Sequence, residues 1–160
     1  SKSDEQNGDA GQAKAGELLF DATEGCTQRN HFILVDDPFG DGPKAGKSTL
    51  GTQGRQKMVL LNDKGFFTMP ADRANKAVVV RLAVVGKPDL KIAMVSLAGH
   101  TNFNKTLSAT GKWVELELPL SATKKRIEDG AKIVDITVWH KDLTEGTVLY
   151  IESARLVDVK

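Results

Sequence analysis

The sequence has a single cysteine, few aromatic residues and no long apolar run. The lone cysteine and the lack of apolar runs each exclude a class of structure. Because Cys26 has no second cysteine to pair with, the chain can form neither an intrachain disulfide nor a thiolate metal cluster. No apolar stretch approaches the roughly 20 residues that a membrane-spanning helix needs. The 22 basic and 21 acidic residues are interspersed, so we expect neither nucleic acid nor an anionic membrane as a partner.

Recognisable catalytic and metal-binding spacings are also missing. His31, His100 and His140 are scattered and form no zinc motif. The segment Gly42–Thr49 resembles a phosphate-binding P-loop, but Asp41 stands where that motif requires its first glycine. A P-loop must also open a helix, and the residues that follow this segment are rich in glycine. We therefore interpret Gly42–Thr49 as part of an ordinary loop.

The chain divides into a polar start and a long β-rich remainder. Residues 1–16 contain no aromatic or β-branched residue, so we predict a disordered tail or linker there. Residues 17–160 are long enough to bury a core and are predicted to form a single β-sandwich domain. Within them, residues 36–54 are rich in glycine, proline and lysine and predict a long loop.

Alternating apolar and polar residues predict about nine antiparallel strands. The pattern is clearest in residues 76–85, 113–120 and 132–140. The other expected strands are residues 17–22, 31–35, 57–61, 66–69, 90–97 and 147–159. Residues 62–65 read as a hairpin turn, residues 122–129 as the one short helix, and neighbouring Tyr150 and Ile151 as the sign of a bulge in the last strand. Such a succession is typical of an all-β fold, a jelly-roll β-sandwich with two sheets.

Two tryptophans on strands with acidic neighbours suggest a sugar-binding surface. Trp113 shares a strand face with Glu115 and Glu117, and Trp139 shares one with Asp135. Sugars stack on aromatic rings, and their hydroxyl groups pair with charged acceptors and donors. If these strands belong to one sheet, the predicted ligand-binding residues are Trp113, Trp139, Glu115, Glu117, Asp135, Arg81 and His140. The alternative is an ordinary solvated sheet face with cross-strand charge pairs. A glycosidase needs a pair of carboxylates at a defined separation around a cleft, and nothing in the sequence fixes such a pair.

A calcium site is a second candidate. Asp21 and Glu24 follow the first expected strand, and Asp158 lies at the end of the last one. The two ends of a jelly roll commonly lie side by side, so these carboxylates could converge on a structural Ca²⁺, which prefers oxygen ligands. The alternative is that all three are solvated acids.

Three segments resemble galactose-binding-like jelly rolls. LLFDATEG, from Leu18, resembles their first strand, and GKWVELEL, from Gly111, resembles their strand that starts with an aromatic residue after a glycine turn. LYIESARLV, from Leu149, resembles their closing strand, although Ser153 stands where the family often has a second acid or Asn. The resemblance implies a non-catalytic carbohydrate-binding module, often with a structural calcium ion near the termini.

On these grounds we expect a secreted, extracellular or periplasmic module that binds a polysaccharide or oligosaccharide. It would belong to, or be associated with, a larger carbohydrate-active protein, and other domains of that protein would be further partners. An extracellular structural or adhesion domain that binds protein is the alternative, and a small polysaccharide hydrolase or lyase is a third interpretation. The sequence does not name the glycan.

Overall fold

The computed structural model describes residues 16–24, 26–40, 42–50, 56–86, 92–98, 101–107, 110–123, 126–140 and 148–159. Nearly all regular structure in them is β, which confirms the predicted class. The strands are β1 Glu17–Asp21, β2 Gln28–Asn30, β3 Phe32–Val35, β4 Ala45–Leu50, β5 Gln56–Leu61, β6 Phe67–Thr68, β7 Lys76–Val85, β8 Ile92–Leu97, β9 Thr101–Thr106, β10 Val114–Pro119, β11 Lys132–Ile133, β12 Asp135–His140 and β13 Val148–Asp158. Two 3-10 helices are η3 Arg73–Asn75 and η4 Leu120–Thr123.

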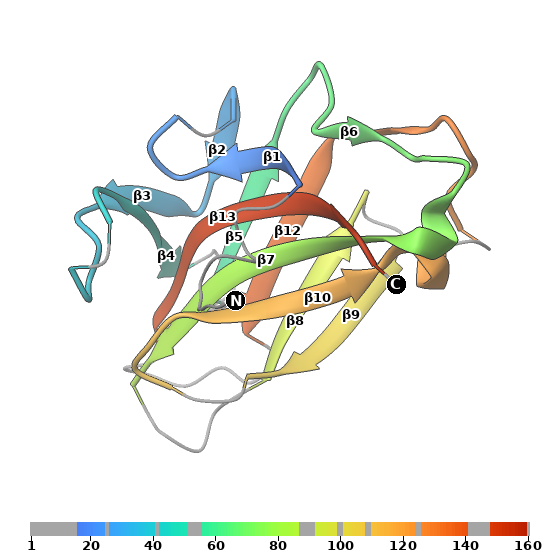
Figure 1. Cartoon of the computed structure of the whole chain (residues 1–160). Coiled ribbons are helices and arrows are strands. Elements are labelled where there is room, and N and C mark those ends of the chain that lie inside the picture. Colours follow the sequence, from blue (N-terminus) through green and yellow to red (C-terminus); the bar gives the residue numbers. More distant parts are fainter. Residues whose placement is uncertain are drawn as a thin grey trace.

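The strands form a β-sandwich with two layers (Figure 1). The front layer consists of β10, β7, β13 and β4, with β1 paired to β13 and β3 paired to β4. The back layer consists of β5, β12, β8 and β9, with β2 paired to β5. All these pairs are antiparallel. Because β4 pairs with β13 and, at its C-terminal end, with β5, the two layers are one continuous hydrogen-bonded sheet.

The core lies between the layers and follows the predicted alternation closely. On β7 the predicted inner face is fully buried: Val78, Val80, Leu82 and Val84. The back layer supplies Ile136 and Val138 from β12, and Met58 and Leu60 from β5. Each such side chain stabilises the fold by about 1.5–3 kcal/mol relative to an exposed position. The opposite side of every one of these strands is left to form the outer faces of the sandwich.

The predicted long loop at residues 36–54 is wrong in its centre, where β4 lies. This strand was missed because its buried positions carry small residues instead of large apolar ones. Ala45 and Ser48 are buried, and a Cβ atom at Gly46 would lie only 2.8 Å from Cδ2 of Phe32 and 3.0 Å from Cγ2 of Ile151. Only glycine allows β4 to pass this close to the core. The same strand confirms that the Gly42–Thr49 segment opens no helix.

Three local predictions need correction. The turn at residues 62–65 forms, with Gly65 N–H donating to Asn62 O at 2.8 Å, but β5 and β6 do not pair: β5 joins β12, and β6 joins β11. The predicted helix at residues 122–129 is instead the end of η4 followed, after residues outside the description, by turns. Val134 is exposed rather than part of the core, because it separates β11 from β12.

The predicted bulge in the last strand is confirmed, since the β13 register with β7 shifts between Ile151 and Ser153. Other predictions lie outside the described residues. These are the predicted tail at residues 1–16 except Gly16, and two turns that the sequence also predicts, at residues 86–89 except Gly86 and at residues 141–146. No helix in the described part of the chain has the length and apolar character to cross a membrane.

Candidate functional site

The residues predicted to form one sugar-binding face lie on opposite layers. Arg81 and Glu115 belong to the neighbouring strands β7 and β10 of the front layer, where they are directly paired. Asp135 and Trp139 belong to β12 in the back layer. The prediction of a single face was therefore wrong, because the core separates the two groups. Each outer face has to be judged separately.

On the front face Trp113 is buried and not an exposed stacking platform. Only 8% of its surface is accessible. Its indole Nε1–H points at the Asp37 carboxylate, with distances of 3.3 Å to Oδ1 and 3.2 Å to Oδ2. The Phe39 ring meets the indole edge-on, at 5.6 Å between ring centroids and 87° between planes. The segment between β3 and β4 thus covers Trp113, and a glycan has no indole face to stack on there.

The rest of the front face is occupied by internal charge pairs. Arg81 Nε donates to Glu152 Oε1 at 2.8 Å, and Arg81 Nη1 lies 3.8 Å from Glu115 Oε2. The same guanidinium lies 5.6 Å from the centre of the Trp113 ring, a cation–π arrangement. Glu117, two residues along β10 from Glu115, is exposed. Arg81 thus has two carboxylate partners and an aromatic one within the protein.

The outer face of the back layer is arranged differently, as three rows of residues that run across the strands. The central row, which we call the Thr137 row, crosses five strands through directly paired positions. Its members are Asn30, Val59, Thr137, Ser96 and Asn102. Four strand spacings of about 4.8 Å make this row roughly 19 Å long. Inner and outer positions alternate along β12, since Ile136 and Val138 are buried and Thr137 is partly exposed.

Two further rows flank the Thr137 row. On one side lie Gln28, Leu61 and Asp135, and on the other side Thr49, Lys57, Trp139, Met94 and Asn104. We call the three rows together the back face. Only Lys57 and Asp135 among its members are charged. The remaining polar members are amides and hydroxyl residues, and an amide offers both donors and acceptors to a ligand.

Asp135 also lines a cavity of about 360 Å³ at the end of the back face. Arg126, Glu128 and Lys132 contribute to the same lining. Ala98, in the left-handed region with φ of 55°, donates its N–H to Asp135 O at 3.1 Å. Asp135 is partly exposed and its Oδ1 is buried, so its part in ligand binding stays a prediction. For Trp139 and His140 only the backbone positions at the end of β12 are described.

The three acids predicted to hold calcium are not brought together. Asp21 pairs in register with Ser153, whereas Asp158 lies five residues further along β13, opposite Lys76. Asp158 accepts a hydrogen bond from Lys76 Nζ, which raises the pKa of that ammonium group. Asp21 Oδ1 accepts from Thr23 N–H at 2.8 Å, and no group of three potential metal ligands occurs among the described residues. These side chains therefore do not fit the predicted ion.

Cys26 precedes β2 at the edge of the back layer. Its Sγ lies 3.0 Å from Gln28 O, and burial raises the pKa of the thiol above its ordinary value. A raised pKa lowers the fraction of thiolate, the reactive form.

Comparison with known proteins defines the fold type. No protein-family model and no curated sequence matches the chain, but solved structures do. SGBP-B from a xyloglucan utilization locus of Bacteroides uniformis superposes on 89% of this chain with a TM-score of 0.58 and 12% identity, and this chain spans 50% of that protein. A second similar structure is a family 11 carbohydrate-binding module of Clostridium thermocellum in complex with a β-1,3-1,4-mixed-linked tetrasaccharide. It superposes with a TM-score of 0.57 at 14% sequence identity, and the match covers 90% of this chain and 96% of the module.

A family 29 carbohydrate-binding module complexed with cellulohexaose gives a TM-score of 0.51 at 13% identity, with 88% of both chains covered. The protein is thus a β-sandwich of the type found in carbohydrate-binding modules, as the sequence resemblance implied. At such low identities the likeness concerns the fold.

Proposed function

We propose that this protein binds a polysaccharide without catalysing its breakdown, and that the back face is the binding surface. The observation that carries the proposal is the Thr137 row: five paired positions across five strands, four of which hold polar and uncharged residues. An extended sugar chain lying along this row would meet the exposed amides of Asn30 and Asn102 at its two ends and the partly exposed Thr137 at its centre, while Ser96 is buried. The fold shared with modules that hold a tetrasaccharide and cellulohexaose supports the same reading.

The composition of the back face favours an uncharged glycan. An acidic polysaccharide needs several basic side chains along its path, and Lys57 is the one basic member of the three rows. Neutral sugars instead need paired donors and acceptors, which Asn102 and Asn104 supply from exposed positions on β9. Trp139, two residues after Thr137 on β12, is proposed as the stacking residue, because the sequence alternation that exposes Asp135 and Thr137 continues to it.

The parent protein and its location are also part of the proposal. SGBP-B belongs to a xyloglucan utilization locus, and this chain covers 50% of it. Another neighbour, at a TM-score of 0.55, is the family 11 module of a cellulosomal cellulase. By analogy, we infer that the chain works as one module of a secreted or surface-exposed carbohydrate-active protein.

A glycan-panel screen tests the proposal. The purified protein is incubated with neutral and acidic polysaccharides, and retention is compared for the natural chain and for Trp139→Ala. We expect retention on a neutral polysaccharide and its loss in the variant, with a nearly unchanged melting temperature. Unfolding of Trp139→Ala would mean that Trp139 belongs to the core. In that case the screen uses Asn104→Ala instead, because Asn104 is exposed and lies in the same row.

Other outcomes of the screen would overturn the proposal. Absence of retention on every polysaccharide, together with oligomers in light scattering, would favour an adhesion domain. Release of reducing sugars or unsaturated products would indicate a hydrolase or lyase. Calcium stays a prediction without an assigned site, and repeating the screen with EDTA tests it. If the protein holds a structural Ca²⁺, its melting temperature should fall in EDTA. An unchanged melting temperature would contradict the prediction of calcium.

A further inference from the structure

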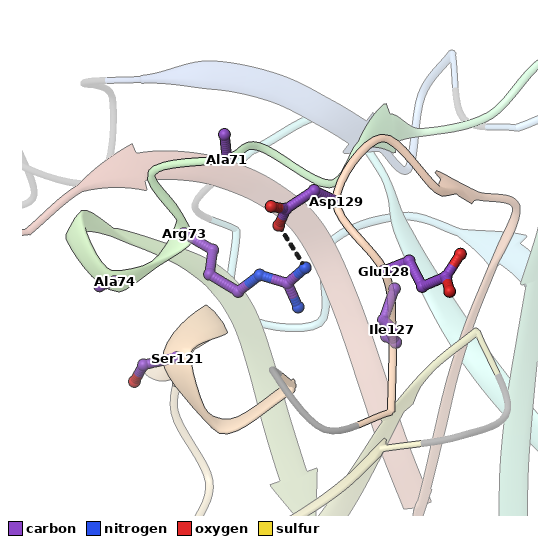
Figure 2. Close-up of a pocket in the computed structure, with 7 residues that line it drawn as sticks. All are labelled: Ala71, Arg73, Ala74, Ser121, Ile127, Glu128 and Asp129. Atoms are coloured by element: carbon purple, nitrogen blue, oxygen red, sulfur yellow. Dashed lines mark hydrogen bonds and ion pairs between the residues drawn. The ribbon is translucent and has the colours of Figure 1, made fainter.

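A separate pocket of about 640 Å³ lies at one end of the sandwich, where η3 and η4 meet the turns after residue 125 (Figure 2). Its volume is within the 300–1,000 Å³ range of small-molecule sites. Two parts of the chain that are distant in the sequence form its walls: Ala71, Arg73 and Ala74 from the first, and Ser121, Ile127, Glu128 and Asp129 from the second. None of these residues was selected from the sequence or belongs to the three rows of the back face, although Ile127 and Glu128 also line the cavity beside Asp135.

Arg73 lies at the base of this pocket and is almost wholly buried, with 6% of its surface accessible. Its Nη1 donates to Thr123 Oγ1 at 2.9 Å, and its Nη2 donates to Asp129 Oδ1 at 2.6 Å. Thr123 Oγ1 in turn donates a hydrogen bond to Leu120 O within η4, at 2.6 Å. These bonds fix the guanidinium plane. A guanidinium has five N–H donors, and the bonds to Thr123 and Asp129 use two of them.

The lining selects an uncharged ligand. Arg73 contributes one positive charge, while Asp129 and Glu128 contribute two negative charges, so a free anion is not favoured. A metal cation is disfavoured by the guanidinium at the base. Figure 2 shows the Glu128 carboxylate directed away from Arg73, which leaves the Arg73–Asp129 pair as the polar centre. That pair offers donors and acceptors side by side, the arrangement that vicinal hydroxyl groups require.

The remaining walls are small or apolar. Ala71 and Ala74 leave room at the mouth, and the Ile127 side chain is buried against the core. Such surfaces suit the C–H groups of a sugar ring, while the hydroxyl groups reach the ion pair. We propose that this pocket binds one uncharged sugar ring, as a free monosaccharide or as the terminal residue of a glycan. The back face would bind the interior of a chain, and the pocket would bind its end.

This inference does not rest on the back face, and NMR can test the two sites separately. Isotope-labelled protein is titrated with free glucose, galactose, mannose, xylose and arabinose. With at least one of them, we expect the backbone amide signals of Ala74, Ser121 and Asp129 to shift. Ala74→Trp, which fills the mouth, should abolish these shifts, whereas Ala122→Trp should keep them, because Ala122 is exposed on η4 outside the lining.

Two further variants complete the test. Asp129→Asn keeps the shape but removes the charged acceptor, and should weaken binding at least about tenfold; it also serves if Ala74→Trp does not fold. Thr137→Lys, on the back face, should leave the pocket shifts unchanged even if polysaccharide binding is lost. The proposal is overturned if no sugar of the panel shifts the pocket signals, or if the shifts persist in both Ala74→Trp and Asp129→Asn.

Discussion

The two outer faces of the sandwich show how different two sides of one β-sheet fold can be. On the front face, Arg81 is paired with two carboxylates and Trp113 is covered by the segment between β3 and β4. On the back face, amide and hydroxyl residues lie in rows across five strands and have only two charged members. The front face pairs Arg81 and covers Trp113, whereas the proposed binding surface on the back face carries exposed amides at Asn30, Asn102 and Asn104.

This difference shows that tryptophan and acid content alone does not locate a binding surface. Each face has one tryptophan and the front face has more acids, but the groups of the front face interact with one another. On the front face Trp113 is covered and Arg81 is held between two carboxylates, so neither presents an open surface to a ligand. On the back face Asn30, Asn102 and Asn104 are exposed, although Gln28 donates to Asp63 and Ser96 is buried.

The largest expected effect comes from removing Trp113. Trp113→Ala should lower the free energy of unfolding by about 3–5 kcal/mol, because a buried indole and its contact with Asp37 are lost. Chemical denaturation measures this change. Glu117→Ala, exposed on the same strand, is the control and should stay within about 0.5 kcal/mol of the natural protein. If Trp113→Ala keeps its stability and loses polysaccharide binding, the front face is the binding surface after all.

A smaller loss of stability is expected from crowding β4, the strand that joins the two layers. Gly46→Val should destabilise the protein by about 1–3 kcal/mol, since its side chain would collide with Phe32 and Ile151. The thermal melting temperature reports the change. Lys47→Val adds the same side chain one residue along, at a partly exposed position, and should leave the melting temperature nearly unchanged. Equal behaviour of the two variants would contradict the close approach at Gly46.

The smallest effect is expected from the front-face ion pairs. Arg81→Met keeps much of the packing of the side chain but removes its contacts with Glu115 and Glu152. Because Arg81 is partly exposed, we expect a loss of no more than about 1 kcal/mol. Polysaccharide retention should not change. A loss of retention with a folded protein would show that these charges take part in binding.

The fold could be predicted largely from the sequence because large apolar residues alternate along its central strands. The inner face of β7 and the alternation in β12 follow directly from Val78 to Val84 and from Ile136 and Val138. The strand β4 could not be predicted in this way. Its buried residues Ala45 and Gly46 are small, so the strand shows no alternation of large apolar and polar residues. The turn at residues 62–65 was found, but strand pairing depends on distant contacts that local patterns do not report.

The site was harder to predict for a similar reason. Asp135 was selected, but Asn30 and Asn102 were not, because a polar residue on a strand looks the same whether it faces solvent or a ligand. Their alignment with Thr137 arises from the pairing of β2, β5, β12, β8 and β9, which is a tertiary property. Arg73 was missed as well, since its burial depends on Thr123 and Asp129, about fifty residues away along the chain.

The most direct measurement compares the same new side chain on the two faces. Thr137→Lys places a charged, bulky group at the centre of the Thr137 row, and Glu117→Lys places it on the front face. Isothermal titration calorimetry with the neutral polysaccharide retained in the screen, together with melting temperatures, reports binding and folding. We predict two folded proteins, with binding weakened at least about a hundredfold in Thr137→Lys and unchanged in Glu117→Lys. Unchanged binding in a folded Thr137→Lys, or its loss in Glu117→Lys, would contradict the assignment of the back face.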